Sequence, residues 1–205
     1  RGVEQAAPGK RISPGAGVLD GEPQHRTSWN VGPAIGKRSG GDILVGDGVD
    51  CYNVQGFPLY VNHSYFDPRQ NGYTLFARKV DTTVDTTKRT RGKGKGKGKG
   101  KARDGAAKAP IWQRSIPITG KAMAKAGKVL FVAGEPMRFE DPSYENYVAA
   151  YNGELGGRLL ALSADDGTEL AEYKLEAAPV WDSIAVAGGR LFISLEDGTV
   201  QCLGQ

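Results

Sequence analysis

The sequence of 205 residues predicts an all-β protein made of several small antiparallel sheets. Three observations support this fold class. Short apolar runs alternate with turn dipeptides along most of the chain, no long segment has the 3.6-residue period of a helix, and the runs recur as similar copies. The 30 glycines agree with it, because a chain with many tight turns needs residues that tolerate positive φ angles.

Strands are predicted where mostly apolar runs end near Asp-Gly or Asn-Gly, since both pairs readily form hairpin turns. The five pairs are Asp47-Gly48, Asn71-Gly72, Asn152-Gly153, Asp166-Gly167 and Asp197-Gly198. The predicted strand runs are residues 42–45, 49–54, 73–77, 129–133, 159–162, 170–175, 184–187, 191–195 and 200–203. The best helical candidate is the short segment 144–151.

Similar segments recur at a distance that exceeds one compact blade. Residues 126–132 (AGKVLFV) resemble residues 188–194 (GGRLFIS), 62 positions later, and residues 40–45 are a looser copy. Small antiparallel sheets repeated in this way are typical of a β-propeller, in which each blade is buried only by its neighbours. Segments 79–110 and 135–155 interrupt the repeat, which explains why its spacing is longer than the roughly 40–45 residues of a compact blade.

We expect a partial β-propeller of about three blades, each a four-stranded antiparallel sheet, with the last blade lacking its outer strand. Residues 1–25 are an irregular lead-in and residues 26–205 hold the blades. The first blade, 26–115, carries a disordered Lys/Gly insertion at 79–110, and its outer hairpin joins 73–79 to 111–115. The middle blade, 116–175, has predicted strands at 116–124, 128–133, 158–163 and 168–175. The last blade, 178–205, has strands at 180–187, 190–195 and 199–203.

The net charge of +4 conceals one strongly basic segment in an acidic chain. Residues 88–103 hold nine of the 27 basic residues and no acidic one, which leaves 18 basic residues against 23 acidic ones. A basic nucleic-acid-binding face on the folded part is therefore not expected. No apolar run approaches the roughly 20 residues of a membrane-spanning helix. The chain opens on Arg1 with no signal peptide, so we expect a fragment or a processed product.

The basic segment is the most unusual feature of the sequence. Glycine at every second position removes helix propensity and any apolar face, so the segment cannot pack a core. A flexible polycation could bind DNA, an acidic polysaccharide or an anionic lipid, and the alternative is a solvated loop that grew by repeat expansion in a hairpin turn. The candidate polyanion-binding residues are Lys88, Arg89, Arg91, Lys93, Lys95, Lys97, Lys99, Lys101 and Arg103.

The three tryptophans are predicted to be structural. Trp112 and Trp181 lie beside predicted strands, where tryptophans of propellers commonly dock between neighbouring blades, and Trp29 is similar. Stacking on a cofactor is the alternative. The two cysteines, Cys51 and Cys202, are not in metal-ligand spacing, and they form either one disulfide or two buried thiols.

No catalytic or metal-binding residues can be identified. The two histidines, His25 and His63, stand far apart and are expected to be surface or turn residues. No Ser-His-Asp arrangement, G-x-S-x-G, H-E-x-x-H or P-loop pattern occurs. Asp165-Asp166 and Glu196-Asp197 could be paired carboxylates, but each pair precedes a glycine between strands, so turn chemistry explains them.

Residues 112–204 resemble the C-terminal end of bacterial pyrroloquinoline-quinone-like (PQQ-like) β-propeller repeat proteins. The matching pieces are WQRSIP at 112–117, LFVAG at 130–134, LSADDG at 162–167, PVWD at 179–182, GGRLFIS at 188–194 and DGTVQCLG at 197–204. Residues 25–29 and 43–45 resemble an upstream block of the same proteins, whereas the Lys/Gly segment has no counterpart there.

The resemblance implies a propeller located in the periplasm or cell envelope. Quinone-dependent dehydrogenases of this kind hold PQQ and calcium with an aromatic platform, carboxylate and amide ligands and a catalytic Asp, and none of these motifs can be placed in this sequence. We therefore expect a non-catalytic scaffold that binds a protein or another macromolecule and joins the remaining blades of its parent chain. The alternative is part of a quinoprotein dehydrogenase whose active-site residues lie in missing blades.

Overall fold

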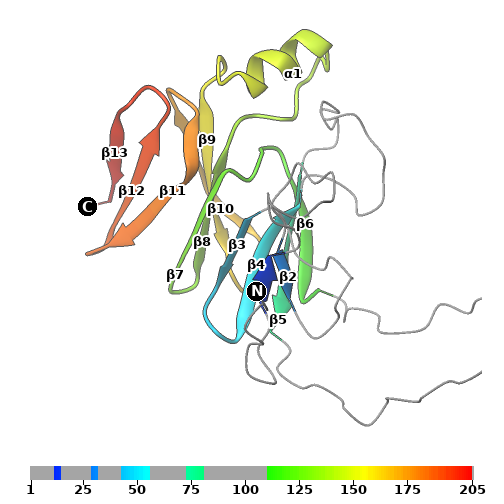
Figure 1. Ribbon diagram of the computed structural model, residues 1–205, viewed down its shortest axis with the longest axis vertical. Helices are drawn as coiled ribbons and strands as arrows, with labels where there is room; N and C mark the ends of the chain where they lie inside the picture. Colours follow the sequence, from blue (N-terminus) through cyan, green and yellow to red (C-terminus); the bar gives the residue numbers. More distant parts are fainter. Residues whose placement is uncertain (1–11, 15–28, 32–42, 56–72, 81–109, 205) are drawn as a thin grey trace, which may run out of the picture.

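The chain is almost entirely β-structure in the computed structural model, which describes residues 12–14, 29–31, 43–55, 73–80 and 110–204 (Figure 1). Within these residues, three antiparallel sheets of four, four and three strands follow one another along the sequence, and none closes into a barrel. A separate two-stranded sheet pairs β1 (Ile12–Pro14) with β2 (Trp29–Val31). The predicted all-β class and the missing fourth strand of the last sheet are confirmed.

Each larger sheet is a meander whose neighbouring strands are consecutive in sequence. The first sheet holds β3 (Ile43–Gly46), β4 (Asp50–Gln55), β5 (Tyr73–Lys79) and β6 (Trp112–Ile116). The second sheet holds β7 (Ala122–Ala126), β8 (Val129–Gly134), β9 (Gly157–Ser163) and β10 (Glu169–Leu175). The third sheet holds β11 (Pro179–Ala187), β12 (Arg190–Leu195) and β13 (Val200–Leu203). The predicted pairing of 73–79 with 111–115 is observed between β5 and β6.

The first strands of the three sheets lie next to one another. Strand β7 contacts β3 on one side and β11 on the other. The chain passes from the last strand of one sheet to the first strand of the next through residues 117–121 and 176–178. Both passages lie at the end of the sheets where the helix α1 (Tyr144–Tyr151) sits, which we call the upper end (Figure 1).

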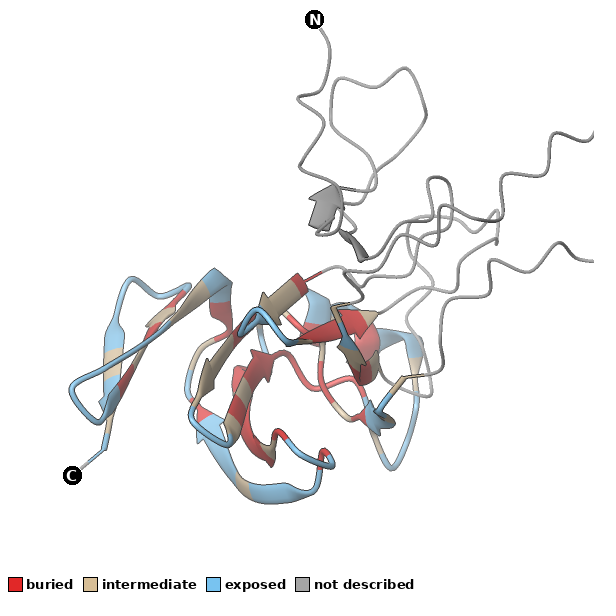
Figure 2. Ribbon diagram, turned by 90° about the horizontal axis from the view of Figure 1, so that it is seen from below, coloured by how far each residue is buried: buried red, intermediate tan, exposed pale blue. Residues whose placement is uncertain are grey.

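The central strands β8 and β9 of the second sheet are largely buried because this sheet packs between the other two. The core shared with the first sheet includes Val54, Leu75, Ile116, Leu130, Val132 and Leu160. The core shared with the third sheet includes Ala133, Leu159, Leu175, Leu191, Ile193 and Leu195, with Phe131 packed against it. Successive residues of β8 therefore enter different cores, as the two-residue period of a strand requires. In Figure 2 the buried residues concentrate in these strands, whereas β13 near the C-terminus is largely exposed.

The second sheet begins later in the sequence than its predicted strand at 116–124. Ile116 is the last residue of β6 and pairs with Tyr73, and Ile118 forms an isolated bridge with Pro136. Pro117 has no N–H to continue a ladder. Gly120 passes so close to the first sheet that a Cβ there would lie 2.4 Å from Cγ1 of Val54. Residues 117–121 therefore form the passage between two sheets, and β7 starts at Ala122.

The structural repeat differs by one residue from the repeat seen in the sequence. Ala126 pairs with Val129 across the β7–β8 turn, and Ala187 pairs with Arg190 across the β11–β12 turn. Equivalent positions are therefore 61 residues apart, not 62. The difference matters because a slip of one residue moves every side chain to the opposite face of the sheet. In the structural register, Phe131 of the second sheet is equivalent to Phe192 of the third.

Trp112 joins the first sheet to the second. Its indole Nε1 donates a 2.9 Å hydrogen bond to the carbonyl of Ala164, which follows β9, and its ring packs against the core of the two sheets. Gly167 makes room for the ring: its φ is +72°, and a Cβ there would lie 2.7 Å from the indole. Trp181 is not docked in this way, because 53% of it is exposed.

The two tryptophans should therefore respond differently to the same substitution. We expect Trp112→Phe to lower the free energy of unfolding by about 1–3 kcal/mol, because it removes the hydrogen bond to Ala164 and leaves a void between two sheets. Trp181→Phe serves as the matched control and should change it by less than about 0.5 kcal/mol. Urea unfolding followed by circular dichroism measures both. Equal losses in the two variants would contradict the inter-sheet role of Trp112.

Candidate functional site

The upper end of the second sheet carries an inserted segment, residues 135–156, between β8 and β9. Its helix α1 begins after Ser143, whose Oγ accepts a 3.1 Å hydrogen bond from the amide of Asn146. Tyr147 and Ala150 point inward and form a small core with Met137. Phe139 adds an edge-to-face contact with Tyr147, at 5.2 Å between ring centroids. The insertion is therefore held by its own apolar core.

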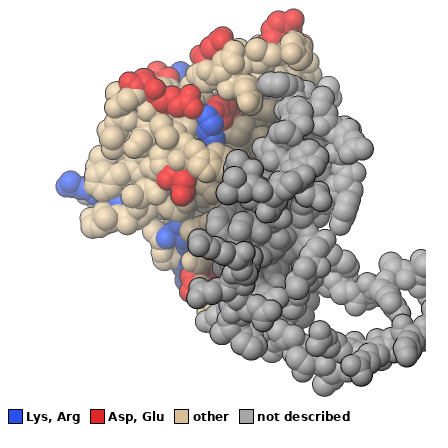
Figure 3. All heavy atoms as spheres, in the orientation of Figure 1, with Lys and Arg blue, Asp and Glu red and all other residues tan. Residues whose placement is uncertain are grey.

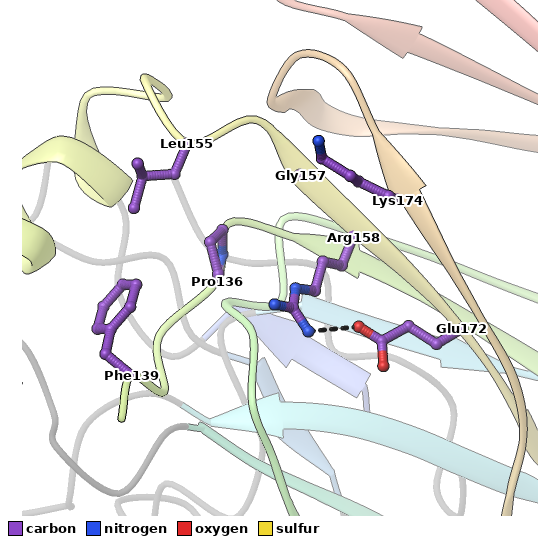
Figure 4. A pocket seen from close by; sticks show the side chains of 7 residues that line it. All are labelled: Pro136, Phe139, Leu155, Gly157, Arg158, Glu172 and Lys174. Carbon is purple, nitrogen blue, oxygen red and sulfur yellow. Dashed lines mark hydrogen bonds and ion pairs between the residues drawn. The ribbon is translucent and has the colours of Figure 1, made fainter. Parts of the chain in front are cut away.

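An open pocket of about 500 Å³ lies between this insertion and strands β9 and β10 (Figure 4). Its apolar side comes from the insertion and consists of Pro136, Phe139 and Leu155. Its polar side carries the charged residues Arg158, Glu172 and Lys174. An Nη1 atom of Arg158 lies 2.6 Å from Oε1 of Glu172, whereas Lys174 makes no ion pair with any residue in the described part of the chain. Such a pocket can receive an apolar group that carries a polar end.

A partly buried ion cluster lies at the same end of the sheets. Lys121, just before β7, pairs through its Nζ with Glu135 of the insertion and, at 2.6 Å, with Glu196 of the β12–β13 turn. The side chain of Glu135 is only 3% exposed, and it also accepts a hydrogen bond from the Thr119 hydroxyl. Burial by itself lowers the pKa of Lys121, but the hydrogen bonds to Glu135 and Glu196 outweigh it and raise that pKa overall. The cluster thus links the second sheet, the insertion and the third sheet.

Removing Lys121 should be costly because it leaves the buried carboxylate of Glu135 without a counter-charge. We expect Lys121→Met to lower the free energy of unfolding by about 3 kcal/mol at neutral pH. Lys128→Met is the matched control, since the Lys128–Asp165 pair is exposed, and it should cost less than about 0.5 kcal/mol.

The raised pKa of Lys121 also determines how the stabilisation by the ion cluster depends on pH. The stabilisation is fully present below the ordinary lysine pKa of about 10.4 and is lost as the pH rises through the higher value of the folded protein. Denaturant titrations of the wild type and Lys121→Met between pH 7 and pH 11 test this. A constant difference across that range would show that charge is not the cause.

Strand β11 is irregular where it meets the ion cluster. Its register with β12 shifts between Pro179 and Ile184, and Asp182 adopts a φ of +53°, which is unusual for a residue with a side chain. The amide of Asp182 donates a 2.9 Å hydrogen bond to the carbonyl of Lys121, so the bulge ties the third sheet to the second. The buried Ser183 hydroxyl has no hydrogen-bond partner within the described structure.

The aspartates of the Asp-Gly turns have structural roles. Asp166 accepts a 2.9 Å hydrogen bond from the amide of Thr168, and Asp197 accepts one of the same length from Thr199. The hydrogen bond from the Thr168 amide lowers the pKa of Asp166, and those from the Thr199 hydroxyl and then the Thr199 amide lower the pKa of Asp197. Asp47 is held in the same way by the amides of Asp50 and Val49, with help from Lys125, so its pKa is also lowered. Turn chemistry therefore accounts for these carboxylates.

The cysteines differ from both alternatives drawn from the sequence. Cys51 and Cys202 are free thiols rather than a disulfide, and only Cys51 is buried, whereas Cys202 is exposed. Strand β4, which carries Cys51, lies in the first sheet, and β13, which carries Cys202, lies in the third, with the second sheet between them. Burial raises the pKa of Cys51.

Several candidate residues lie outside the described residues. These are His25, His63, the side chain of Trp29 and the nine basic residues from Lys88 to Arg103. Polyanion binding by the basic segment therefore stays a prediction from the sequence. The sequence analysis did not identify the Lys121–Glu135–Glu196 cluster or the pocket, since both join residues far apart in the chain.

Among the residues that the structure describes, no three His, Cys, Asp or Glu side chains gather in a way that could hold a metal ion. None of the helices in the described segments has the length and apolar character needed to cross a membrane. No protein-family model matches the chain, and no curated protein matches it.

Proposed function

We propose that the three sheets are consecutive blades of a larger β-propeller that serves as a non-catalytic binding scaffold. The observation that carries this proposal is the adjacency of the first strands β3, β7 and β11. Each sheet runs as a meander away from that shared line of strands, and neighbouring sheets stack face to face. This arrangement is expected when blades are placed around a central axis.

The outward face of the third sheet supports the presence of a further blade. Phe192 is equivalent to Phe131, which packs into the core between the second and third sheets. On the same face as Phe192 lie its partner Cys202 and, two pairs further along the ladder, Val200, which is 64% exposed. Strand β13 is also an edge strand whose outer N–H and C=O groups can pair with another strand. A further sheet stacked here would bury these residues.

Cys202 reports whether this face is covered. We expect the chain to associate as its concentration rises and the rate of alkylation of Cys202 by iodoacetamide to fall in parallel, because association covers the third sheet. Cys51 provides an internal control that reacts only on unfolding, since it is buried. Light scattering and mass spectrometry measure the two quantities. A compact monomer at all concentrations, with a uniformly reactive Cys202, would contradict the blade arrangement.

The second candidate is that the chain is part of a PQQ-dependent dehydrogenase. For both the scaffold and the dehydrogenase, we propose a location in the periplasm or cell envelope. Among the described residues, no three His, Cys, Asp or Glu side chains are grouped as a metal site requires, so no observation there supports the calcium ion that accompanies the cofactor. The upper end instead offers an insertion and a pocket suited to binding. We therefore favour the scaffold.

Reduction of a redox dye separates the two functions. On the scaffold proposal, addition of PQQ and calcium in the presence of alcohols should leave dye reduction at the level of a protein-free control. A rate that requires PQQ and rises with protein concentration would overturn the scaffold proposal. The matched variant Asp182→Asn removes the one carboxylate of the β11 bulge and would then show whether that residue takes part.

A further inference from the structure

The outer side of α1 bears a stripe of exposed aromatic and apolar side chains. Tyr144, Val148 and Tyr151 recur at positions i, i+4 and i+7, so they lie on one side of the helix. Tyr144 is 67% and Tyr151 68% exposed, whereas Tyr147 and Ala150 fill the core on the inner side. Large exposed aromatic side chains that are grouped in this way mark interaction sites more often than isolated ones do.

Acidic side chains surround this stripe. Glu140 and Asp141 precede the helix, Glu145 lies in its first turn and Glu154 follows it, and all four are exposed. The only basic residue of the insertion is Arg138, which donates a 3.1 Å hydrogen bond to the Ser115 hydroxyl instead of pairing with these acids. Figure 3 shows acidic atoms gathered at the upper end, including the tip formed by α1. We call Tyr144, Val148, Tyr151 and the four acids the α1 surface.

We propose that the α1 surface docks a Lys/Arg-rich extended segment of a partner protein. The faces of the two tyrosine rings attract ammonium and guanidinium groups, and the acids form ion pairs with neighbouring cations. The same charge repels the phosphates of nucleic acids and the headgroups of anionic membranes, which leaves a basic protein segment as the complementary occupant. The proposal rests on the scaffold function and names the surface through which the scaffold acts.

Binding of a labelled peptide tests the proposal on the full chain. The probe is a fluorescein-labelled peptide of eight alternating Lys and Arg residues, and its control has Gln at every position. We expect the basic peptide alone to bind, with an affinity that falls steeply between low and high salt, because exposed charges are screened. The double variant Tyr144→Ala/Tyr151→Ala should weaken binding about tenfold or more, as removal of two interface tyrosines does elsewhere.

Matched variants separate this surface from general charge effects. Glu145→Gln/Glu154→Gln should weaken binding about fivefold, whereas Glu169→Gln, an exposed acid on β10, should leave it unchanged. Tyr173→Ala, an exposed tyrosine on the same strand, is the control for Tyr144 and Tyr151. All these side chains are exposed, so the variants should fold, which circular dichroism verifies.

Two outcomes would overturn the proposal. One is absence of binding at low salt, or equal binding by the wild type and the Tyr144/Tyr151 variant. The other is binding restricted to a synthetic copy of residues 88–103, which would make a second copy of this chain the occupant in place of a separate partner. Either result leaves the dye-reduction assay unaffected, so failure of the α1 surface is distinguishable from failure of the scaffold function.

Discussion

Packing of the second sheet between the first and the third is the interaction on which the other features depend. Because β8 contributes alternate residues to two cores, it has no face that is free to carry polar chemistry. Along β8, polar groups are therefore confined to the flanking residues Lys128 and Glu135. The insertion that bears α1 leaves the sheet at the end of β8 and returns at the start of β9, so two buried strands fix both of its ends. A binding surface on a long connection thereby gains a rigid base.

The ion cluster at the upper end complements this apolar packing. A buried carboxylate such as that of Glu135 is tolerated only where a counter-charge and hydrogen-bond donors replace its hydration. Lys121 and Thr119 supply them from the passage between the first two sheets, and Lys121 also reaches Glu196 on the third. Apolar contacts between stacked sheets are non-directional, whereas ion pairs and hydrogen bonds need particular partners. A cluster with fixed partners on three elements permits only one alignment.

The strands of this chain could be predicted from local sequence signals, whereas its long-range contacts could not. The Asp-Gly turns, the strand at 190–195 and the helix at 144–151 follow from short patterns and agree with the structure. The start of β7 was placed too early, because the close approach of Gly120 to Val54 is a contact between sheets that no local pattern contains. The repeat was misaligned by one residue because Lys128 was matched with Arg190, whereas the structural register matches Leu130 and Phe131 with Leu191 and Phe192. The exposure of Trp181 likewise depends on whether another sheet covers it.

The bulge in β11 also has a dynamic consequence. The amide hydrogen of Asp182 is bonded to the carbonyl of Lys121, which directly precedes β7 of the second sheet, and not to a neighbouring strand of its own sheet. Most amides of a sheet exchange with solvent only when a ladder of that sheet opens. The amide of Asp182 instead exchanges when the third sheet moves away from the second, even if both stay intact. The hydrogen-exchange rate of this single amide therefore reports how often the third sheet separates from the second.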